Sequence, residues 1–325
     1  MSLKPFLHRI HVLLLLTILS CDPGEIPISS VERGNAHTTR LDMGVTYDYQ
    51  MYFDLETNTV VADNFKVDWD IGLSCATEEW KVVLNSSRGG SVAYSPLLNF
   101  TSAVSLNSLS WRYDAPSGDY DSTALGSMLD SNGFYIINLG YSSTGSELGY
   151  KKFKVDTLNS DTYSVRMASL NGSSDTTIII QKDPLRNIVC VSLKEASQLS
   201  IEPLKKDWDL YFTQYIHLFK DDNIITPYLV TGVLSNRHNV EVALIDSIEF
   251  VDIDTEHALS SIYERSLNSI GYDWKYYDFN DGYIVDSKKV YIIRDTDQKV
   301  YKLHFIDFYN VNGEKGSPTF EFQEI

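Results

Sequence analysis

Two copies of an Asp-Trp-Asp motif, Asp68-Trp69-Asp70 and Asp207-Trp208-Asp209, hold the residues of this chain whose spacing is best suited to chemistry. Carboxylates two residues apart on a strand point to the same face, where they could act as acid and base or bind a cation. Both copies precede a predicted strand in the same way. We therefore favour a structural interpretation, in which the tryptophan is a core anchor and the carboxylates cap backbone N–H groups.

The histidines outside the N-terminal segment do not form a metal-binding pattern. They are His37, His217, His238, His257 and His304. None lies two or four residues from another, and none flanks a cysteine at the spacing of a zinc site. The chain also lacks a Gly-x-Ser-x-Gly elbow, a phosphate loop, a dinucleotide glycine fingerprint and a His-Glu-x-x-His motif. We predict that the protein is not an enzyme and has no metal site formed by its own side chains.

A dense aromatic run is the better candidate for ligand binding. Its members are Tyr272, Trp274, Tyr276, Tyr277, Phe279 and Tyr283. Strand alternation places Tyr272, Trp274 and Tyr276 on one face, which we expect to be core. Tyr277 and Phe279 would project from the other face, where they could line a groove for a flat hydrophobic ligand. An aromatic ladder between neighbouring strands is the other interpretation, and the residues alone favour it.

The elements around these motifs occur twice in the same order. Besides the Asp-Trp-Asp copies, the matching segments are 52–55 with 190–193, 111–114 with 274–278, 134–137 with 290–293, and 150–153 with 301–305. In the last pair we match Tyr150 with Tyr301. Matches that keep their order at drifting offsets are typical of a tandem duplication that has acquired different insertions.

The body is predicted to be all-β. Short alternating runs of Tyr, Phe, Val, Ile and Thr are separated by turn pairs such as Asn171-Gly172 and Asn312-Gly313. With the repeat, this pattern predicts two tandem antiparallel β domains, over residues 41–186 and 187–325. Helix signals are few, and one short helix is expected over residues 260–267.

The N-terminal segment predicts export and lipid anchoring. Residues 1–20 have a basic start and a short apolar stretch, as in a signal peptide, and Cys21 follows directly, as in a bacterial lipobox. Cys21 is therefore predicted to carry the lipid, and residues 21–40 read as a flexible tether. The alternative is plain secretion, with Cys21 an ordinary thiol.

Charge and cysteine content limit the remaining possibilities. The formal net charge of −17 argues against nucleic acid as a partner. Cys75 and Cys190 lie in different repeats, and in an oxidising compartment they could pair and link the two halves. Two buried free thiols are the alternative.

The order of these segments resembles the HmuY-like haem-binding lipoproteins of Bacteroidetes. The resemblance covers most of the body and is best over residues 189–325, which include Lys-Lys-Val-Tyr-Ile-Ile-Arg-Asp and a closing Thr-Phe-Glu-Phe strand. It implies an all-β lipoprotein on the outer membrane. It also implies haem held between two axial side chains and passed to a TonB-dependent receptor.

The resemblance also suggests where the haem ligands would lie. One ligand position of the family falls on Tyr277, and tyrosinate can ligate ferric haem iron. The second lies in a loop that is shorter here, where His257 is the nearest candidate. The leading hypothesis is a surface-exposed lipoprotein that binds haem or a related porphyrin for iron acquisition. The alternative is a non-haem accessory lipoprotein that binds a partner protein or an outer-membrane transporter.

Overall fold

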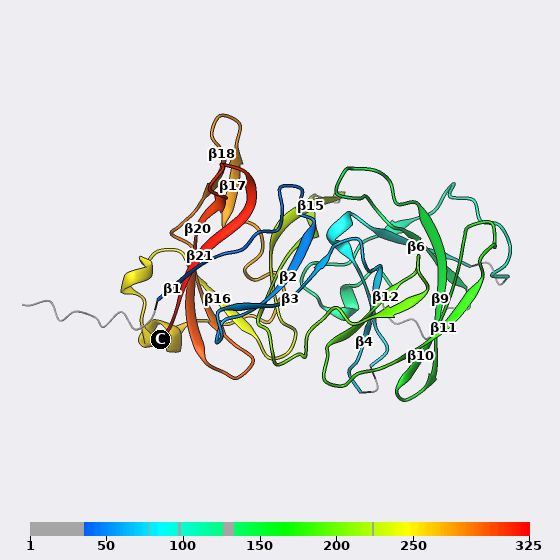
Figure 1. Ribbon diagram of the computed structural model, residues 1–325, viewed down its shortest axis with the longest axis horizontal. Coiled ribbons are helices and arrows are strands. Elements are labelled where there is room, and N and C mark those ends of the chain that lie inside the picture. Colours follow the sequence, from blue (N-terminus) through cyan, green and yellow to red (C-terminus); the bar gives the residue numbers. More distant parts are fainter. Residues whose placement is uncertain (1–35, 78, 97–98, 126–132, 223) are drawn as a thin grey trace, which may run out of the picture. The chain divides into compact units, whose positions relative to one another are not determined.

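The computed structural model describes residues 36–325, apart from 78, 97–98, 126–132 and 223. Its regular structure is nearly all antiparallel β (Figure 1), which confirms the predicted all-β fold. The predicted signal peptide, Cys21 and most of the predicted tether lie outside the described residues. Within the described part of the chain, no helix is long and apolar enough to span a membrane.

Two larger sheets hold most of the strands. The first has five, in the order β1 (His37–Arg40), β21 (Lys315–Glu324), β20 (Val300–Tyr309), β19 (Val290–Arg294) and β16 (Glu241–Ile245). The second has six, in the order β11 (Thr176–Gln181), β10 (Thr162–Ala168), β9 (Tyr150–Asn159), β8 (Phe134–Asn138), β6 (Ser91–Ser95) and β7 (Trp111–Arg112).

Two four-stranded sheets and one hairpin complete the β structure. One sheet runs β15 (Ile224–Ser235), β14 (Leu210–Asp221), β2 (Tyr49–Asp54) and β3 (Thr59–Phe65). The other runs β5 (Val82–Leu84), β4 (Ile71–Ser74), β12 (Ile188–Ser192) and β13 (Ser197–Leu199). The hairpin is β17 (Lys275–Asp278) with β18 (Gly282–Val285).

The helices are short. Among the described residues they are the 3-10 turns η1 (Ser86–Arg88), η2 (Tyr120–Ser122) and η4 (Phe250–Asp252), and the α-helix α1 (Thr255–Ser260). Asp254 caps the start of α1. The helix therefore ends at Ser260, where the sequence pattern predicted it to begin, because its capping residue lies six residues earlier.

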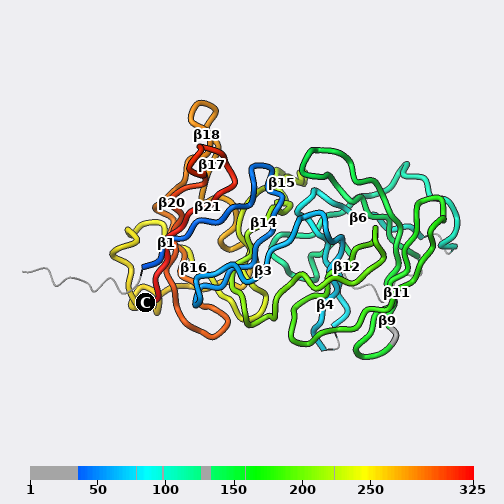
Figure 2. The backbone as a smooth tube through the Cα atoms, in the orientation of Figure 1, coloured from blue at the N-terminus to red at the C-terminus, as the bar shows by residue number. Residues whose placement is uncertain are grey.

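The two repeats exchange their first three strands. The hairpin β2–β3 pairs with β14 of the second repeat, and the equivalent hairpin β12–β13 pairs with β4 of the first. In the same way β1 pairs with β21, and β11 pairs with β10. The two four-stranded sheets consequently have the same internal order. Figure 2 shows the blue β1 beside the red β21.

This exchange corrects the expected domain boundary. One hydrophobic cluster draws its buried residues from positions 71–193, and a second draws them from positions 41–55 and 210–322. A cut between residues 186 and 187 would divide the first cluster and remove β2 from the second. The described residues form one compact unit rather than two independent tandem domains.

The Asp-Trp-Asp motifs occupy equivalent places in the two sheets. Asp70 Oδ2 accepts a hydrogen bond from the backbone N–H of Leu193 (2.6 Å), and Asp209 Oδ2 accepts one from Leu55 (2.9 Å). The strands β2 and β12 end just before Leu55 and Leu193. Each carboxylate therefore caps the end of a strand that the other repeat contributes. The structural interpretation of the motif is confirmed, and it explains how the exchanged strands are held.

Two asparagines close the turns of the motifs. Asn85 Nδ2 donates to the carbonyl oxygen of Trp69 (2.8 Å), and Asn236 Nδ2 donates to that of Trp208 (2.6 Å). Both tryptophans are 5 % exposed. The pairing of side chains is therefore repeated atom for atom, which supports the duplication independently of the strand order.

Strand register corrects two of the sequence matches. Ile136 lies opposite Lys152 in the β8–β9 pair, and the equivalent Ile292 lies opposite Lys302. The equivalent of Tyr301 is therefore Lys151 rather than Tyr150. The match between the Trp111 and Trp274 segments is also wrong. Arg112 pairs with β6, and the residue in the equivalent place opposite β16 is Glu264. The strand that follows Trp274, β17, pairs among the described residues with β18 and not with β16.

Cys75 and Cys190 are free and buried, so the predicted alternative of two free thiols holds. The β4–β12 register places Cys190 opposite Gly72, three residues from Cys75. Three residues of strand span roughly 10 Å, beyond the reach of a disulfide, whose Cα atoms lie within about 7 Å. Burial raises the pKa of the Cys75 thiol to about 11, which keeps it protonated and unreactive.

Candidate functional site

Tyr277 lies on a hairpin that presents aromatic rings outward. It faces Tyr283 across the β17–β18 pair, with ring centroids 5.2 Å apart, and its ring also meets Phe279 at 5.8 Å. Tyr276 and Tyr277 are each 56 % exposed, and Phe279 is 95 % exposed. The hairpin extends beyond the neighbouring strands at the top of Figure 1. No part of the described protein covers the Phe279 ring, so a ligand bound here would itself have to cover it.

The base of this hairpin is anchored in the core. Trp274 stacks on Phe305 at 3.8 Å, and the Tyr309 hydroxyl accepts a hydrogen bond from the backbone N–H of Tyr283 (2.6 Å). Because β17 begins only at Lys275, strand alternation does not extend back to Tyr272. Trp274 is buried while Tyr276 is exposed, so the prediction that these two share a core face is wrong.

His257 serves the start of α1. Its Nδ1 lies 2.7 Å from Asp254 Oδ1, and it forms a capping box with this residue. Lys302 Nζ donates to the carbonyl oxygens of Phe250 and Ile253, which ties this region to the beginning of β20. The Tyr277 hairpin instead contacts the end of the same strand, at Tyr309.

The structure does not bring Tyr277 and His257 together. The region of His257 is held at Lys302 of β20, and the Tyr277 hairpin is held at Tyr309. These two residues are seven positions apart on β20, which corresponds to roughly 20 Å along a strand. Two axial ligands of one iron must lie on either side of the same atom. His257 is therefore not the partner of Tyr277 in this conformation.

A second aromatic cluster, which sequence reasoning missed, surrounds His217. The imidazole packs edge-on against Phe219 (4.7 Å) and Tyr272 (5.0 Å), and Phe219 in turn meets Tyr228 (6.0 Å). Phe219 and Tyr228 are 43 % and 60 % exposed. Tyr272 thus joins the β14–β15 hairpin to the segment that leads into β17.

The imidazole of His217 is unusual among the described histidines. Its Nδ1 is buried and has no hydrogen-bond partner in the described part of the chain. Burial lowers the pKa of His217, with only Asp273 opposing the shift, so the ring is neutral at pH 7. A neutral imidazole whose tautomer is not fixed by a protein partner is able to accept the geometry that a ligand requires.

A sequence signal for this cluster existed. His217 and Phe219 alternate on β14, and Tyr228 is the register partner of His217 across the hairpin. His217 has no second histidine or cysteine at metal-ligand spacing, so that spacing rule gave no reason to include it in a site. Its neighbours are instead aromatic, as a flat ligand would require.

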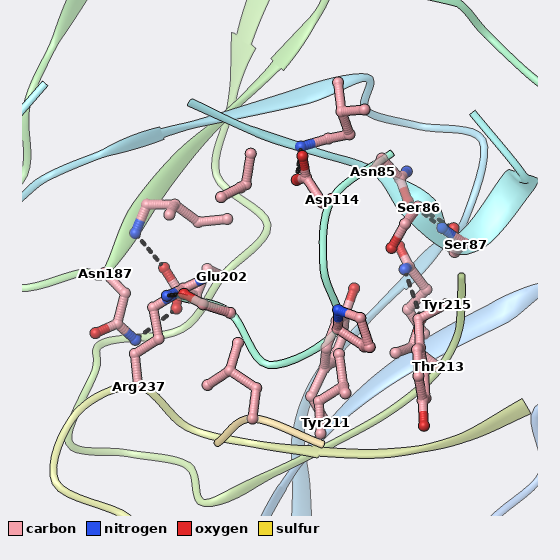
Figure 3. A pocket seen from close by; sticks show the side chains of 18 of the residues that line it. Asn85, Ser86, Ser87, Asp114, Asn187, Glu202, Tyr211, Thr213, Tyr215 and Arg237 are labelled. Carbon is pink, nitrogen blue, oxygen red and sulfur yellow. Dashed lines mark hydrogen bonds between the residues drawn. The ribbon is translucent and has the colours of Figure 1, made fainter. Parts of the chain in front are cut away.

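A cavity borders both Asp-Trp-Asp motifs, and Figure 3 shows some of the side chains that line it. Trp69 and Trp208 both line it, and its volume is about 120 Å³. That is about the volume of four waters, and less than the roughly 300 Å³ at which ligand pockets begin. This cavity is therefore too small for a porphyrin.

Two buried carboxylates border the cavity. Glu202 accepts hydrogen bonds from Asn187 Nδ2 (2.8 Å) and from the backbone N–H of Ile188 (2.7 Å), as Figure 3 shows. Asp114 accepts from the backbone N–H groups of Leu84 and Ala124. Burial raises the pKa of Glu202 to about 7 and that of Asp114 to about 6. Asp114 thus ties together segments of the first repeat, and Glu202 ties together segments of the second.

Comparisons with known proteins identify the family. The family model described as HmuY protein matches residues 46–322, most of the chain, so the chain belongs to the HmuY family. No curated protein matches the chain at a significant level.

Three solved structures show the range of similarity. The apo form of PinO from Porphyromonas gingivitis is 11 % identical, with a TM-score of 0.35, covering 90 % of this chain and 98 % of that one. A putative HmuY-like haem-binding protein from Bacteroides vulgatus is 12 % identical, with a TM-score of 0.23 and coverages of 88 % and 90 %. An apo HmuY analogue from Tannerella forsythia is 10 % identical, with a TM-score of 0.19 and coverages of 89 % and 96 %.

Proposed function

We propose that this protein binds haem or a related porphyrin against the exposed aromatic residues of the β14–β15 and β17–β18 hairpins. Membership of the HmuY family supports a haem-related role. The observation that supports this location is the neutral His217 imidazole, whose Nδ1 has no hydrogen-bond partner among the described residues and which lies among partly exposed aromatic rings.

The side chains present suit a ferric porphyrin. Imidazole and phenolate both ligate haem iron, and flat aromatic rings pack on the faces of a flat macrocycle. His217 and Tyr277 are the two candidate iron ligands, from neighbouring hairpins. Lys275 links these hairpins, since its Nζ donates to the carbonyl oxygen of Thr231 on β15 (2.6 Å).

Replacing each candidate ligand separately tests the assignment. In ferric haem titrations, His217→Gln should weaken binding at least tenfold and shift the Soret band. Tyr277→Phe should remove a phenolate-to-iron band while leaving the aromatic packing intact. The matched control is His257→Gln, which also removes one imidazole but keeps a side chain suited to the capping box. If all three variants bind ferric haem with the affinity and the spectrum of the wild type, the haem site does not lie on these two hairpins.

The oxidation state of the iron gives a second readout. An anionic phenolate oxygen stabilises ferric iron more than ferrous iron. If Tyr277 is a ligand, wild-type binding should weaken on reduction, and this difference should shrink in Tyr277→Phe. A wild type that holds ferrous haem as tightly as ferric haem would remove Tyr277 from the iron.

We further propose that the protein is anchored by a lipid at Cys21 and exposed on the outer membrane, where it passes its ligand to a TonB-dependent receptor for uptake. The lipobox-like sequence at Cys21 supports this anchor. Cys21→Ser should release the protein from the membrane fraction, as cell fractionation and blotting would measure. Retention of the variant on membranes after a high-salt wash would contradict lipid anchoring.

The alternative is a non-haem accessory lipoprotein that binds a partner protein. Exposed apolar residues at the tip of β14–β15, including Ile224 (69 % exposed) and Ile225 (58 % exposed), favour it as the second candidate. A wild type that binds neither ferric nor ferrous haem would leave this role as the better account of the same surface.

A further inference from the structure

A second pocket, of about 410 Å³, opens next to the cavity between the motifs. Gly118, Arg237 and Leu267 line both, so they form the wall between them. The approach at this wall is close. A Cβ on Gly118 would lie 2.2 Å from Leu267 Cδ1 and 3.1 Å from Arg237 Nη2. The residues shared by the two pockets are therefore closely packed against one another.

Arg237 is held rigidly in this wall. Its Nη1 donates to the carbonyl oxygen of Gly118, and its guanidinium lies over the Tyr120 ring, 4.2 Å from the centroid. None of the ion pairs among the described residues involves Arg237, although Glu202 lies near it in Figure 3. The guanidinium thus keeps donors that no protein carboxylate uses.

Arg265 supplies a second guanidinium to the same pocket. Its Nε donates to Glu241 Oε1 (2.8 Å), and its side chain is 72 % exposed. Glu241 is shared with Arg294, so its charge is already divided between two cations. The terminal nitrogens of Arg265 remain available to a ligand. Two guanidiniums lining one pocket stand out in a chain whose net charge is −17.

The acidic groups nearby are already engaged. Asp119 lines the pocket, but its carboxylate accepts hydrogen bonds from the backbone N–H of Asp121 and the hydroxyl of Ser122 in its own turn. Glu202 and Asp114, behind the wall, accept from backbone and amide donors. The unused hydrogen-bonding capacity of Arg237 and Arg265 is donor only, and the ligand must therefore bring acceptors.

We propose that this pocket binds a small oxyanion, a carboxylate or a phosphate, between Arg237 and Arg265. Planar guanidiniums match both anions bidentately. The hydroxyls of Ser117 and Ser266 line the same pocket. The volume admits an anion with an organic body of monosaccharide size, such as a uronic acid or a sugar phosphate. The site does not involve the two aromatic hairpins and does not depend on haem binding.

Calorimetric titration of the full chain with inorganic phosphate and, separately, with glucuronate tests the proposal. We expect saturable binding of at least one probe that weakens as salt is added. Arg265→Gln should weaken binding severalfold, and Arg237→Gln should weaken it at least tenfold. The matched control is Arg112→Gln on β7, which makes the same change in charge outside the pocket. Binding of glucuronate alone would assign a carboxylate, and binding of phosphate alone would assign a phosphate.

Two controls keep this test decisive. Arg237→Lys retains the positive charge but not the two parallel N–H donors of the guanidinium. This variant should bind the anion more weakly than wild type and more tightly than Arg237→Gln. A thermal melt of each variant shows whether the protein is still folded, since the Arg237 variants lose the hydrogen bond to Gly118. If an Arg237 variant is unfolded, the result for Arg265→Gln, a change at an exposed side chain, decides the test. No saturable heat with either probe, or equal binding by wild type and Arg265→Gln, would overturn the proposal.

Discussion

Trp208→Ala should lower the free energy of unfolding by about 3–5 kcal/mol, the usual cost of removing a buried aromatic side chain. Trp208 is 5 % exposed and meets Tyr52 edge-on, with ring centroids 4.9 Å apart. Because Tyr52 lies on β2, this contact joins the two repeats. The variant should therefore unfold both parts in a single transition rather than the C-terminal half first.

Urea unfolding followed by both circular dichroism and tryptophan fluorescence measures this effect. The two probes should report the same midpoint, shifted downward from wild type. Trp111→Ala, on the half-buried edge strand β7, is the matched control and should cost clearly less. Two separate transitions in Trp208→Ala would show that the halves are independent, contrary to the strand exchange.

Stability should fall as the pH rises from about 4 to about 7. Burial raises the pKa of Glu202 from 4.5, and that of Asp209 from 3.8, in each case to about 7. A carboxyl group with a raised pKa binds its proton more tightly in the folded state than in the unfolded state. Its stabilising contribution is complete below the unfolded pKa and is lost as the pH rises through the folded pKa.

Each group should contribute on the order of 3 kcal/mol to this loss, since one pKa unit corresponds to about 1.4 kcal/mol. Asp209 is the more informative of the two, because the equivalent Asp70 is paired with Arg88 at 2.5 Å, whereas Asp209 is bonded only to backbone N–H groups. Chemical denaturation at pH 5 and pH 8 measures the slope. Glu202→Gln and Asp209→Asn should each flatten it, and a wild type more stable at pH 8 would contradict the assignment.

The duplication was predictable from sequence because its signals are local. Asp70 and Asp209 each cap a strand by a hydrogen bond that needs the same short motif in both copies, so the residues had to recur. The exchange of strands was not predictable. A hairpin such as β2–β3 has the same alternation whether it pairs with β4 or with β14, and only the tertiary pairing distinguishes the two.

The candidate site was predictable only in part. Tyr277 and Phe279 are exposed, as expected, but alternation does not explain it, because Tyr276 on the opposite face of β17 is equally exposed and Phe279 lies in the turn after β17. His257 was chosen for its nearness in sequence, but β20 places it far from Tyr277. The spacing of His217 and Phe219 on β14 was visible in the sequence, but Tyr272 comes from the segment before β17, and no spacing rule connects that segment with β14.

Titration of the wild-type protein with ferric haem, followed by Soret absorbance, tests the central claim most directly. We predict a saturable change with a sharp, shifted Soret band and one haem per chain, together with quenching of tryptophan fluorescence. An absorbance that rises linearly with added haem, without a shifted band or an end point, would contradict haem binding by this member of the HmuY family.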